Sequence, residues 1–510
     1  MEISSIYIAL AWLVALTIIS KVIKNKFPKR KLPPGPWPWP VIGNLNLVGS
    51  NPHESLHYLS QKYGDLMLLK FGSKPVLIVS SPEMAKEFLK THDAIFASRP
   101  PLAAGKFTSF NFSDMTWAPY GRFWRQARKL YLSEIFNPKR LDSFKHIRVE
   151  ETQALISRLH ALSRSNPVYL RDHLPQFTLS TVSRIAMGRK YYSDESNLNE
   201  SSPVTFEKLK WMLDDWFMLG GVINLGDWVP FLSWFDPQGY VKRMKPLGKS
   251  FIEFYKYVLE DHKAKAKETC VPKDMIDVIL QLADDPNLEV KFTSDQIVGL
   301  IHGMQTGGID TSASAVEWAF QELLRKPKII EKANEELDRA IGKERWIQEE
   351  DFTRLPYIEA IIKETFRLHP LCALLPPHYS IEDCCVAGYD IPKGTSVYVN
   401  AWSIGRNPKY WDKPEEFIPE RFLENDIDIK GQNFTLLPFG SGRRRCPGYS
   451  LGIKLVRTTM ANLLHGFNWK LAQDMKPEDI CMEEVYGLTT HLKKPISMIM
   501  EPRLPLHLYN

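Results

Sequence analysis

The stretch Pro438-Phe-Gly-Ser-Gly-Arg-Arg-Arg-Cys-Pro-Gly448 is the most informative part of the 510-residue sequence. It places Cys446 directly after three arginines, where a loop gives way to a helical pattern that starts near Gly448. Glycines allow a backbone to come close to a flat partner. Cationic neighbours and a helix N-terminus lower the pKa of a thiol and favour the thiolate, which binds metals. The stretch therefore predicts a metal-binding thiolate on a close-packed loop.

A second unusual cluster, Gly307-Gly-Ile-Asp-Thr-Ser312, lies inside a long predicted helix at 294–325. Each glycine inside a helix costs about 1 kcal/mol, so a purely structural role is unexpected. Gly299, Gly303 and Gly307 also fit the small-residue spacing of membrane helices. Charged side chains in the same stretch make a membrane span implausible, and the cluster is interpreted as functional.

Two further patterns are weak on their own. Glu364 and Arg367 are three apart and can bridge on one helix face. A surface pair of this kind contributes under about 1 kcal/mol. Trp124 and Arg128 are four apart and share a helix face, which is also typical of an ordinary cation–π pair. Both patterns indicate a function only in combination with the cysteine loop.

The spacing Phe439-x-x-Gly442-x-Arg444-x-Cys446-x-Gly448 resembles the haem-binding loop of the cytochrome P450 superfamily. The resemblance covers almost the whole chain and is greatest for the A-type plant enzymes. It implies a mainly α fold with a minor β-sheet region, built as a helix-rich triangular prism around a haem. It also implies an NADPH- and dioxygen-dependent monooxygenase that acts on a lipophilic plant specialised metabolite such as a phenolic, flavonoid, terpenoid or alkaloid.

The resemblance assigns roles to individual residues. Cys446 becomes the axial thiolate of haem b. Further cofactor-binding residues are expected to pack on the haem or reach its propionates: Trp124, Arg128, His378, Phe439, Arg444 and Gly448. Asp310 and Thr311 are expected to kink the central helix and relay protons to dioxygen. A structural ion-pair network is expected from Glu364, Arg367 and Arg421.

The expected substrate pocket is formed by Gly303, Gln305, Gly307, Ala373, Leu374 and Leu488. Two of these positions depart from the family pattern. Gly303 stands where A-type enzymes usually carry an acid, and Ala373 stands where they commonly carry proline. Both changes reshape the cavity wall, so the resemblance does not name the substrate.

Two alternatives remain open. The first is a haem-thiolate isomerase or dehydratase that uses no dioxygen, against which the presence of both Asp310 and Thr311 argues. The second is a non-catalytic, membrane-tethered haem protein, against which Cys446, Arg444 and Glu364 argue. NADPH dependence and a turnover assay separate these alternatives.

Composition supports a globular body. Hydrophobic residues make up 44% and charged residues 24% of the chain. The net charge of +6 comes mostly from six basic residues between positions 21 and 31. Nothing in the remainder suggests a nucleic-acid-binding surface. Six cysteines in 510 residues are too few for a disulfide framework, and the absence of a C-x-x-C pair excludes a cysteine-rich zinc site.

The N-terminus predicts a membrane anchor. Residues 3–20 carry no charge. As a helix they would span about 27 Å, close to the ~30 Å hydrocarbon core. A cleaved signal peptide would carry its positive charge before this run, not after it. We therefore expect a transmembrane anchor at 1–20, a basic, proline-rich neck at 21–44 and a catalytic domain at 45–510. The positive-inside rule places that domain in the cytosol, at the endoplasmic reticulum membrane.

A separate NADPH-cytochrome P450 reductase is the expected electron donor, because the chain has no Gly-rich nucleotide fingerprint. The body itself reads as mostly helical. The predicted helices are 82–91, 120–133, 138–163, 174–187, 204–219, 243–267, 273–283, 294–325, 328–341, 355–368 and 447–465. Two hairpins are predicted, one from 66–71 with 76–79 and one from 386–391 with 396–399 across Pro392-Lys-Gly394.

Overall fold

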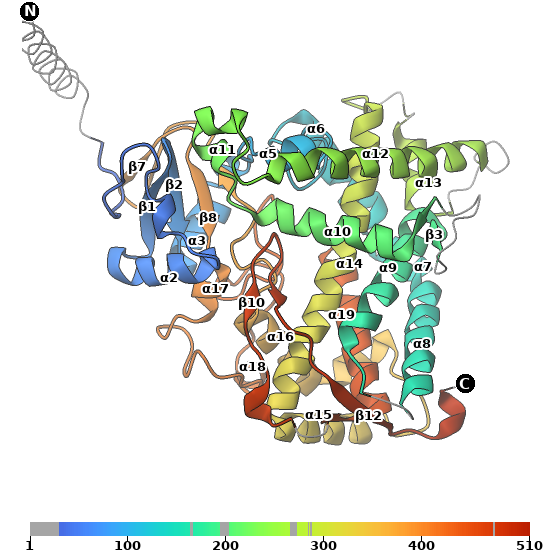
Figure 1. Cartoon of the computed structure of the whole chain (residues 1–510). Helices are drawn as coiled ribbons and strands as arrows, with labels where there is room; N and C mark the ends of the chain where they lie inside the picture. Colours follow the sequence, from blue (N-terminus) through green and yellow to red (C-terminus); the bar gives the residue numbers. More distant parts are fainter. Residues whose placement is uncertain are drawn as a thin grey trace, which may run out of the picture.

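Helices dominate the computed structural model, which describes residues 30–163, 167–193, 203–265, 273–283, 285, 288–472 and 475–509. A small sheet lies to one side of them (Figure 1), so the expected mainly α class with a minor β region is confirmed. The helices are α2 (Pro52–Tyr63), α3 (Pro82–Lys86), α4 (Asp93–Phe96), α5 (Ala103–Phe107), α6 (Arg122–Leu130), α7 (Pro138–Ser143), α8 (Lys145–Leu162), α9 (Leu170–Met187), α10 (Phe206–Gly221), α11 (Leu225–Trp228), α12 (Tyr240–Lys265), α13 (Met275–Ala283), α14 (Ser294–Arg325), α15 (Pro327–Ala340), α16 (Pro356–Leu368), α17 (Ala401–Gly405), α18 (Arg421–Glu424) and α19 (Tyr449–Gly466).

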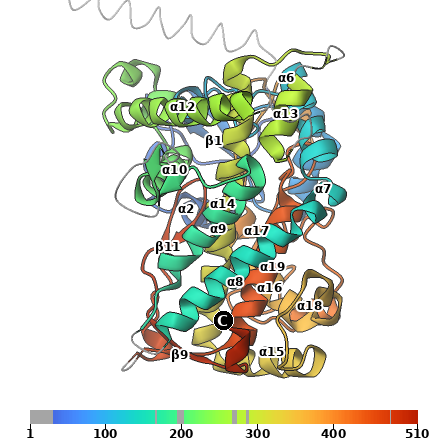
Figure 2. The same ribbon diagram turned by 90° about the vertical axis from the view of Figure 1, so that its right-hand side faces the viewer.

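The long helix α14 forms the centre of the fold. It begins with a capping box, in which Thr293 accepts from the backbone N–H of Gln296 and Gln296 accepts from that of Thr293. Both views show α14 running through the middle of the molecule, with α10 and α12 crossing near its first half (Figures 1 and 2). Helices α9, α16 and α19 also pack against it. The predicted range 294–325 is confirmed at both ends, and the helix is unbroken through Asp310 and Thr311.

The main sheet has the strand order β1-β2-β8-β5. Strands β1 (Leu66–Phe71) and β2 (Lys74–Val79) form the predicted antiparallel hairpin. Strand β8 (Ser396–Val399) lies parallel to β2, and β5 (His378–Tyr379) lies antiparallel to β8. The remaining strands form two-stranded pairs: β3 (Tyr192–Ser193) with β4 (Val204–Thr205), β6 (Cys384–Val386) with β7 (Tyr389–Ile391), β9 (Phe467–Leu471) with β12 (Met498–Pro502), and β10 (Glu484–Val485) with β11 (His491–Leu492).

The second predicted hairpin was wrong. Strand β6 turns back onto β7 through Ala387 and Gly388, which both have positive φ angles of 49° and 76°. Two successive residues of this kind match the twist of a tight hairpin. The turn after Ile391 then delivers β8 to the main sheet, where it pairs with β2 and not with β7. The sequence analysis placed the reversal one turn too late.

Two helix predictions also need correction. The predicted helix 138–163 is two helices, α7 and α8, which meet at Phe144 with φ −96° and ψ 10°. Helix α2 was not predicted, although Asn51 and Pro52 supply a typical helix start. Its apolar face is narrow, with Leu56 among few buried residues, so the periodic signal is weak.

The N-terminal segment is described only from Arg30 onward. The neck packs along β1: the backbone N–H of Leu68 donates to the carbonyl of Pro34 at 2.8 Å, and a Cβ on Gly35 would lie 1.9 Å from the carbonyl oxygen of Leu68. Trp37 is 91% exposed. The predicted transmembrane anchor at 1–20 lies outside the described residues, and within them no helix is long and apolar enough to cross a membrane.

Candidate active site

An apolar cavity of about 240 Å³ lies between α14 and the Cys446 loop. Its wall is assembled from segments far apart in sequence, which the fold brings around the middle of α14. Among the predicted site residues, the cavity wall contains Trp124, Arg128, Gly303, Gly307, Thr311, His378, Phe439, Arg444, Cys446, Gly448 and Leu488. The cysteine, the cationic residues and the central-helix cluster are therefore brought together as the sequence predicts.

Glycines with positive φ angles determine the backbone path of the loop that carries Cys446. Gly440 and Gly442 have φ angles of 64° and 68°, which L-residues with a side chain rarely adopt. A Cβ on Gly442 would also lie 2.1 Å from the carbonyl oxygen of Leu89. The loop closes where the N–H of Cys446 donates to the carbonyl of Phe439 at 2.9 Å. The thiol is thereby fixed in the cavity wall, just before α19.

Burial raises the pKa of the Cys446 thiol, although the Gly448 N–H, Arg128 and Arg445 each act to lower it. The prediction that the cationic neighbours lower the pKa of this thiol more than burial raises it was wrong for the protein alone. Coordination by a metal cation deprotonates a thiol outright. The neighbours of Cys446 favour the same charged form.

Three guanidinium groups surround one side of the cavity. Arg444 lies 4.3 Å over the ring of Trp124 and donates to the carbonyls of Ala97 and Ala118 at 2.5 Å each. Arg128 lines the cavity and forms no hydrogen bond or ion pair with the described residues. Burial lowers the pKa of Arg128 to about 10. A half-buried guanidinium without an ion-pair partner among the described residues fits an anionic ligand group.

Arg99 was missed by the sequence analysis. It lines the cavity and donates to the carbonyls of Thr116 and Pro377 at 2.8 Å. Burial lowers its pKa to about 10. Arg99 precedes two prolines in an extended segment without periodicity, and no local pattern marks it as a site residue.

His378 and Trp124 use their ring nitrogens in the fold. Nδ1 of His378 donates to the carbonyl of Phe96 at 3.0 Å, and the indole N–H of Trp124 donates to the carbonyl of Met115 at 3.2 Å. Burial lowers the pKa of His378 well below its usual value, and Arg99 and Arg444 lower it further. Nε2 of His378 is the ring atom left for a ligand.

These residues fit a haem. The thiol of Cys446 would supply a soft donor to the iron, and the half-buried guanidinium of Arg128 has no ion-pair partner among the described residues. A Cβ on Gly307 would meet no atom within 4 Å. The open space beside Gly307 lies between α14 and the thiol loop. Arg99, Arg128 and Arg444 suit the two propionate groups of the cofactor.

Asp310 and Thr311, the neighbouring pair on the central helix α14, line two different cavities. Thr311 lines the haem cavity and donates its hydroxyl to the carbonyl of Gly307 at 2.9 Å. Asp310 lines a second cavity of about 210 Å³ on another face of α14. Helix α14 is continuous at this point, and a bond from a threonine hydroxyl to the carbonyl four residues earlier often bends a helix, so the expected kink stays a prediction.

Three of the predicted substrate-pocket residues do not line the cavity. Gln305 is fully buried and accepts from the hydroxyl of Tyr255, because its face of α14 points toward α12. Ala373 accepts from the N–H of Trp402, and Leu374 pairs with Asn400, so both serve the packing of α17. Their neighbours in the same segment line the cavity instead: Leu371, Cys372, Leu375 and Pro376.

The predicted structural network is present and buried. Glu364 and Arg367 form two hydrogen bonds at 2.7 and 2.8 Å, and neither side chain has exposed surface. Arg421 donates to Glu364 at 3.1 Å. Arg367 also donates to the carbonyls of Pro414 and Glu416, which fixes the segment before α18 against α16.

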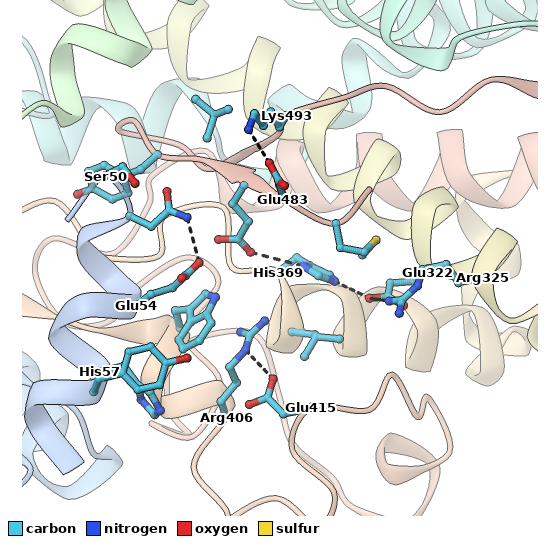
Figure 3. A pocket seen from close by; sticks show the side chains of 18 of the residues that line it. Ser50, Glu54, His57, Glu322, Arg325, His369, Arg406, Glu415, Glu483 and Lys493 are labelled. Atoms are coloured by element: carbon cyan, nitrogen blue, oxygen red, sulfur yellow. Dashed lines mark hydrogen bonds and ion pairs between the residues drawn. The ribbon is translucent and has the colours of Figure 1, made fainter. Parts of the chain in front are cut away.

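A larger cavity of about 860 Å³ lies elsewhere, between α2, α17 and β10 (Figure 3). Its charged side chains are already paired, as the dashed lines from Arg406 to Glu415 and from Lys493 to Glu483 show. Nε2 of His369 lies 2.8 Å from a carboxylate oxygen of Glu322 beside it. This cavity contains no thiol among the described residues and no central-helix residue before Glu322, so we assign the active site to the smaller, apolar cavity.

The largely buried side chain of Glu484, in the wall of this larger cavity, connects β10 to α2. It lies 2.7 Å from Nε2 of His53, and burial alone would raise its pKa. The imidazole of His369, at 3.9 Å, and the hydrogen bond with His53 outweigh burial and hold the pKa of Glu484 well below its usual range. This pairing anchors the strand that leads to Leu488 and the haem cavity.

Comparison with known proteins agrees with this geometry. A sequence model of the cytochrome P450 family matches residues 33–499. The chain is 41% identical to the trimethyltridecatetraene synthase of Zea mays, over 98% of this chain and 94% of that one. It is 40% identical to the flavonoid 3'-monooxygenase of Petunia hybrida, over 96% of this chain and 97% of that one. A zebra fish cytochrome P450 solved with progesterone superposes with a TM-score of 0.74 at 25% identity, covering 89% of this chain and 99% of that one. The chain belongs to the cytochrome P450 family.

Proposed function

We propose that this chain is a haem-thiolate monooxygenase that uses NADPH and dioxygen to hydroxylate a lipophilic plant specialised metabolite. One observation carries the proposal: the thiol of Cys446, the guanidinium of Arg128 and the hydroxyl of Thr311 share the wall of one apolar cavity. Plant relatives with names such as flavonoid 3'-monooxygenase support the same reaction class.

The residues that would hold the haem are those of the cavity wall. Cys446 would bind the iron, Phe439 and Gly448 would pack beside it, and four side chains would meet the propionates: Trp124, Arg128, His378 and Arg444. When bound, the haem supplies the oxygen-atom transfer that side chains cannot perform. The chain binds, orients and protonates, and it excludes bulk water from an apolar space.

Proton supply is the task of the central-helix pair. Thr311 presents a hydroxyl at the cavity wall, and Asp310 holds a carboxylate one residue earlier on the face that reaches the second cavity. The apolar part of the wall offers few other proton donors, so this pair is well placed for general acid catalysis. Its presence favours an oxygen-dependent reaction over an isomerisation.

The substrate is an apolar molecule of the phenolic, flavonoid, terpenoid or alkaloid type. The apolar side chains of Trp216, Phe217, Met304 and Leu488 form part of the cavity wall. Burial against such a surface contributes about 25 cal/mol per Å². The relatives include a flavonoid 3'-monooxygenase, a phenylacetaldehyde oxime monooxygenase and a trimethyltridecatetraene synthase, whose small, largely apolar compounds suit the same class.

A membrane-bound reductase would deliver the electrons from NADPH at the endoplasmic reticulum membrane, where residues 1–20 would anchor the chain with residues 45–510 in the cytosol. Three acceptor patterns for glycosylation test this orientation: Asn111-Phe-Ser113, Asn199-Glu-Ser201 and Asn433-Phe-Thr435. Glycosidase treatment of the plant-expressed protein should leave its mobility unchanged. A mobility shift that disappears when any of these asparagines is replaced by glutamine would place the body in the lumen.

The reaction class is tested with microsomes that contain the full chain and an NADPH-cytochrome P450 reductase. A metabolite panel is first screened by substrate-binding difference spectra, and binders are then incubated with NADPH and ¹⁸O₂. We expect a product that carries one ¹⁸O atom and forms only with NADPH. A product that forms without NADPH and carries no ¹⁸O would instead establish the isomerase or dehydratase. Binding without any product across the panel would favour the non-catalytic haem protein.

A further inference from the structure

Asp310 and Thr311 are neighbours in sequence, yet no hydrogen bond joins their side chains in the described structure. Thr311 donates to the carbonyl of Gly307 within its own helix, at 2.9 Å. Asp310 accepts from a different hydroxyl, that of Thr489, at 2.8 Å. Thr489 lies in the segment between β10 and β11, is 1% exposed and lines the haem cavity. The hydroxyl that joins the Asp310 carboxylate to the haem cavity is therefore that of Thr489.

The donor and acceptor in each hydrogen bond around Thr489 can be assigned in only one way while Asp310 is a carboxylate. Thr489 has one hydroxyl hydrogen, which it donates to Asp310, so it must accept from Nε2 of His491 at 3.0 Å. With its hydrogen on Nε2, neutral His491 accepts at Nδ1 from the hydroxyl of Ser314 at 3.2 Å. The result is a continuous chain of donors from Ser314 through His491 to Thr489.

This chain begins in the second cavity. Ser314, His491 and Asp310 all line it, and Asp214 and Val485 at its edge are exposed, so water reaches it. Arg171 holds the geometry by pairing with Glu317 at 2.9 Å and by donating to the carbonyl of Leu492, next to His491, at 2.7 Å. The backbone N–H of Thr490 donates to the carbonyl of Leu371 at 2.7 Å and fixes the segment from the other side.

We propose that protons enter the haem cavity from the second cavity through Ser314, His491 and Thr489, with Asp310 stabilising the charge in transit. This inference rests on the proposed monooxygenase function. The Thr489 hydroxyl turns into the cavity and gives its proton to an acceptor there, while the Nε2 proton of His491 replaces it. Ser314 gives its proton to Nδ1, which makes the ring positive before Nε2 releases its own proton. Ser314 then takes a proton from a water molecule, whose hydroxide leaves through the second cavity, and the imidazole turns to restore the hydrogen on Nε2. Each O–H and N–H bond that breaks is matched by one that forms, and no electrons are transferred.

Asp310 lies 3.6 Å from Nε2 of His491, close enough to favour the positive ring through which a proton passes. Thr311 then acts inside the cavity, on the proton that Thr489 has delivered. Asp310 and Thr311 alone, as the sequence predicts them, lack this connection.

The first test compares Thr489→Val with Thr489→Ser in the holoenzyme with its reductase. Product, hydrogen peroxide and NADPH are measured on one sample. We expect Thr489→Val to lower product per NADPH by about tenfold or more and to raise peroxide, because general acid assistance contributes ~10²–10⁴-fold. Thr489→Ser keeps the hydroxyl and should stay within about twofold of the unmodified protein.

The matched control is Thr490→Val. Thr490 is 3% exposed, its hydroxyl has no hydrogen-bond partner among the described residues, and it lines neither cavity. Its substitution makes the same chemical change one residue away and should leave the ratio of product to NADPH unchanged. Equal coupling in Thr489→Val, Thr490→Val and the unmodified protein would overturn the relay. If the unmodified protein forms no ¹⁸O-labelled product, the proposed function itself has failed.

A second readout does not depend on turnover. The holoenzyme is labelled with ¹⁵N at its 13 histidines, and the His491 ring signals are assigned by their loss in His491→Gln. We expect the ring hydrogen on Nε2 and a change in the Nε2 shift in Thr489→Val but not in Thr490→Val. A hydrogen on Nδ1 alone, or an Nε2 signal insensitive to Thr489→Val, would contradict the chain of donors even if activity fell.

Discussion

Glu364 and Arg367 form a two-pronged ion pair in which neither side chain has any exposed surface. The two residues are three apart in sequence, yet the pair joins helix α16 to the chain before α18, because Arg367 also donates to the carbonyls of Pro414 and Glu416. Two ions removed from water at this depth are tolerated because each remaining donor and acceptor is used.

Removing the carboxylate of Glu364 should therefore destabilise the folded protein. We expect Glu364→Ala to lower the free energy of unfolding by about 3–5 kcal/mol, since it leaves the Arg367 charge buried and unpaired. The holoenzyme is unfolded with urea and followed by its Soret absorbance. Glu253→Ala is the control, because Glu253 and its partner Lys249 are 65% and 78% exposed. An exposed pair of this kind should contribute under about 0.5 kcal/mol. Equal effects of the two substitutions would contradict a structural role for Glu364.

The Cys446 assignment has a sharper control inside the same cavity, because Cys372 is a second thiol in its wall. Burial raises the pKa of Cys372 to about 12. We expect Cys446→Ser to lose the strongly red-shifted ferrous–CO Soret band, because serine is not an anionic sulfur donor. Cys372→Ser should keep the band. The reverse result would make Cys372 the ligand.

Local patterns were sufficient where the sequence repeats a physical rule at short range. Helix α14 was predicted at both ends because Thr293 and Gln296 form a capping box and the helix is long. The β6–β7 turn at Ala387 and Gly388 was missed because the signal at Pro392-Lys-Gly394 is stronger in sequence, although it only leads the chain toward β2.

In the active site, too, only residues that belong to a short-range sequence pattern could be predicted. The cofactor-binding residues of the Cys446 loop stand in one motif, so their common place in the cavity followed from their spacing. Arg99 and Thr489 lie in irregular segments without such spacing, and only packing brings them to the cavity. The prediction that Gln305 lines the substrate pocket was wrong because it ignored the helix geometry. Gln305 lies two residues after Gly303 on α14, and a helix turns by about 200° over two residues. That turn directs the Gln305 side chain toward Tyr255.

Thr311 provides a test of proton supply from within α14. We expect Thr311→Ala to retain haem and substrate binding, because a small hydroxyl contributes little to either. Product per NADPH should fall and hydrogen peroxide should rise, since the hydroxyl at the cavity wall is lost. Thr458→Ala is the control, because its hydroxyl makes the same bond to the residue four earlier, on α19 away from the cavity. If Thr311→Ala and Asp310→Asn both leave coupling unchanged, the oxygen-activation role lacks support.

His302 predicts a pH dependence of stability. It has no exposed surface, both ring nitrogens lack a hydrogen-bond partner among the described residues, and four aromatic rings surround it: Phe110, Trp216, Phe251 and Tyr255. Burial lowers its pKa to about 3. The unfolded chain binds a proton at His302 near pH 6.5, whereas the folded chain does so only near pH 3. Stability is therefore lost as pH falls below 6.5.

Each unit of pH in that window costs about 1.4 kcal/mol, which gives about 2 kcal/mol at pH 5. We expect His302→Leu to remove this part of the acid sensitivity. The free energy of unfolding is measured by urea titration at pH 7.5 and at pH 5 for both proteins, and the two differences are compared. Packing changes caused by leucine are the same at both pH values and cancel in this comparison, as do the other titrating groups. His507→Gln, an exposed histidine on the C-terminal segment, should leave the difference unchanged. An acid sensitivity of His302→Leu equal to that of the unmodified protein would mean that His302 takes up its proton in the folded state, and the aromatic enclosure would then have to open to water below pH 6.5.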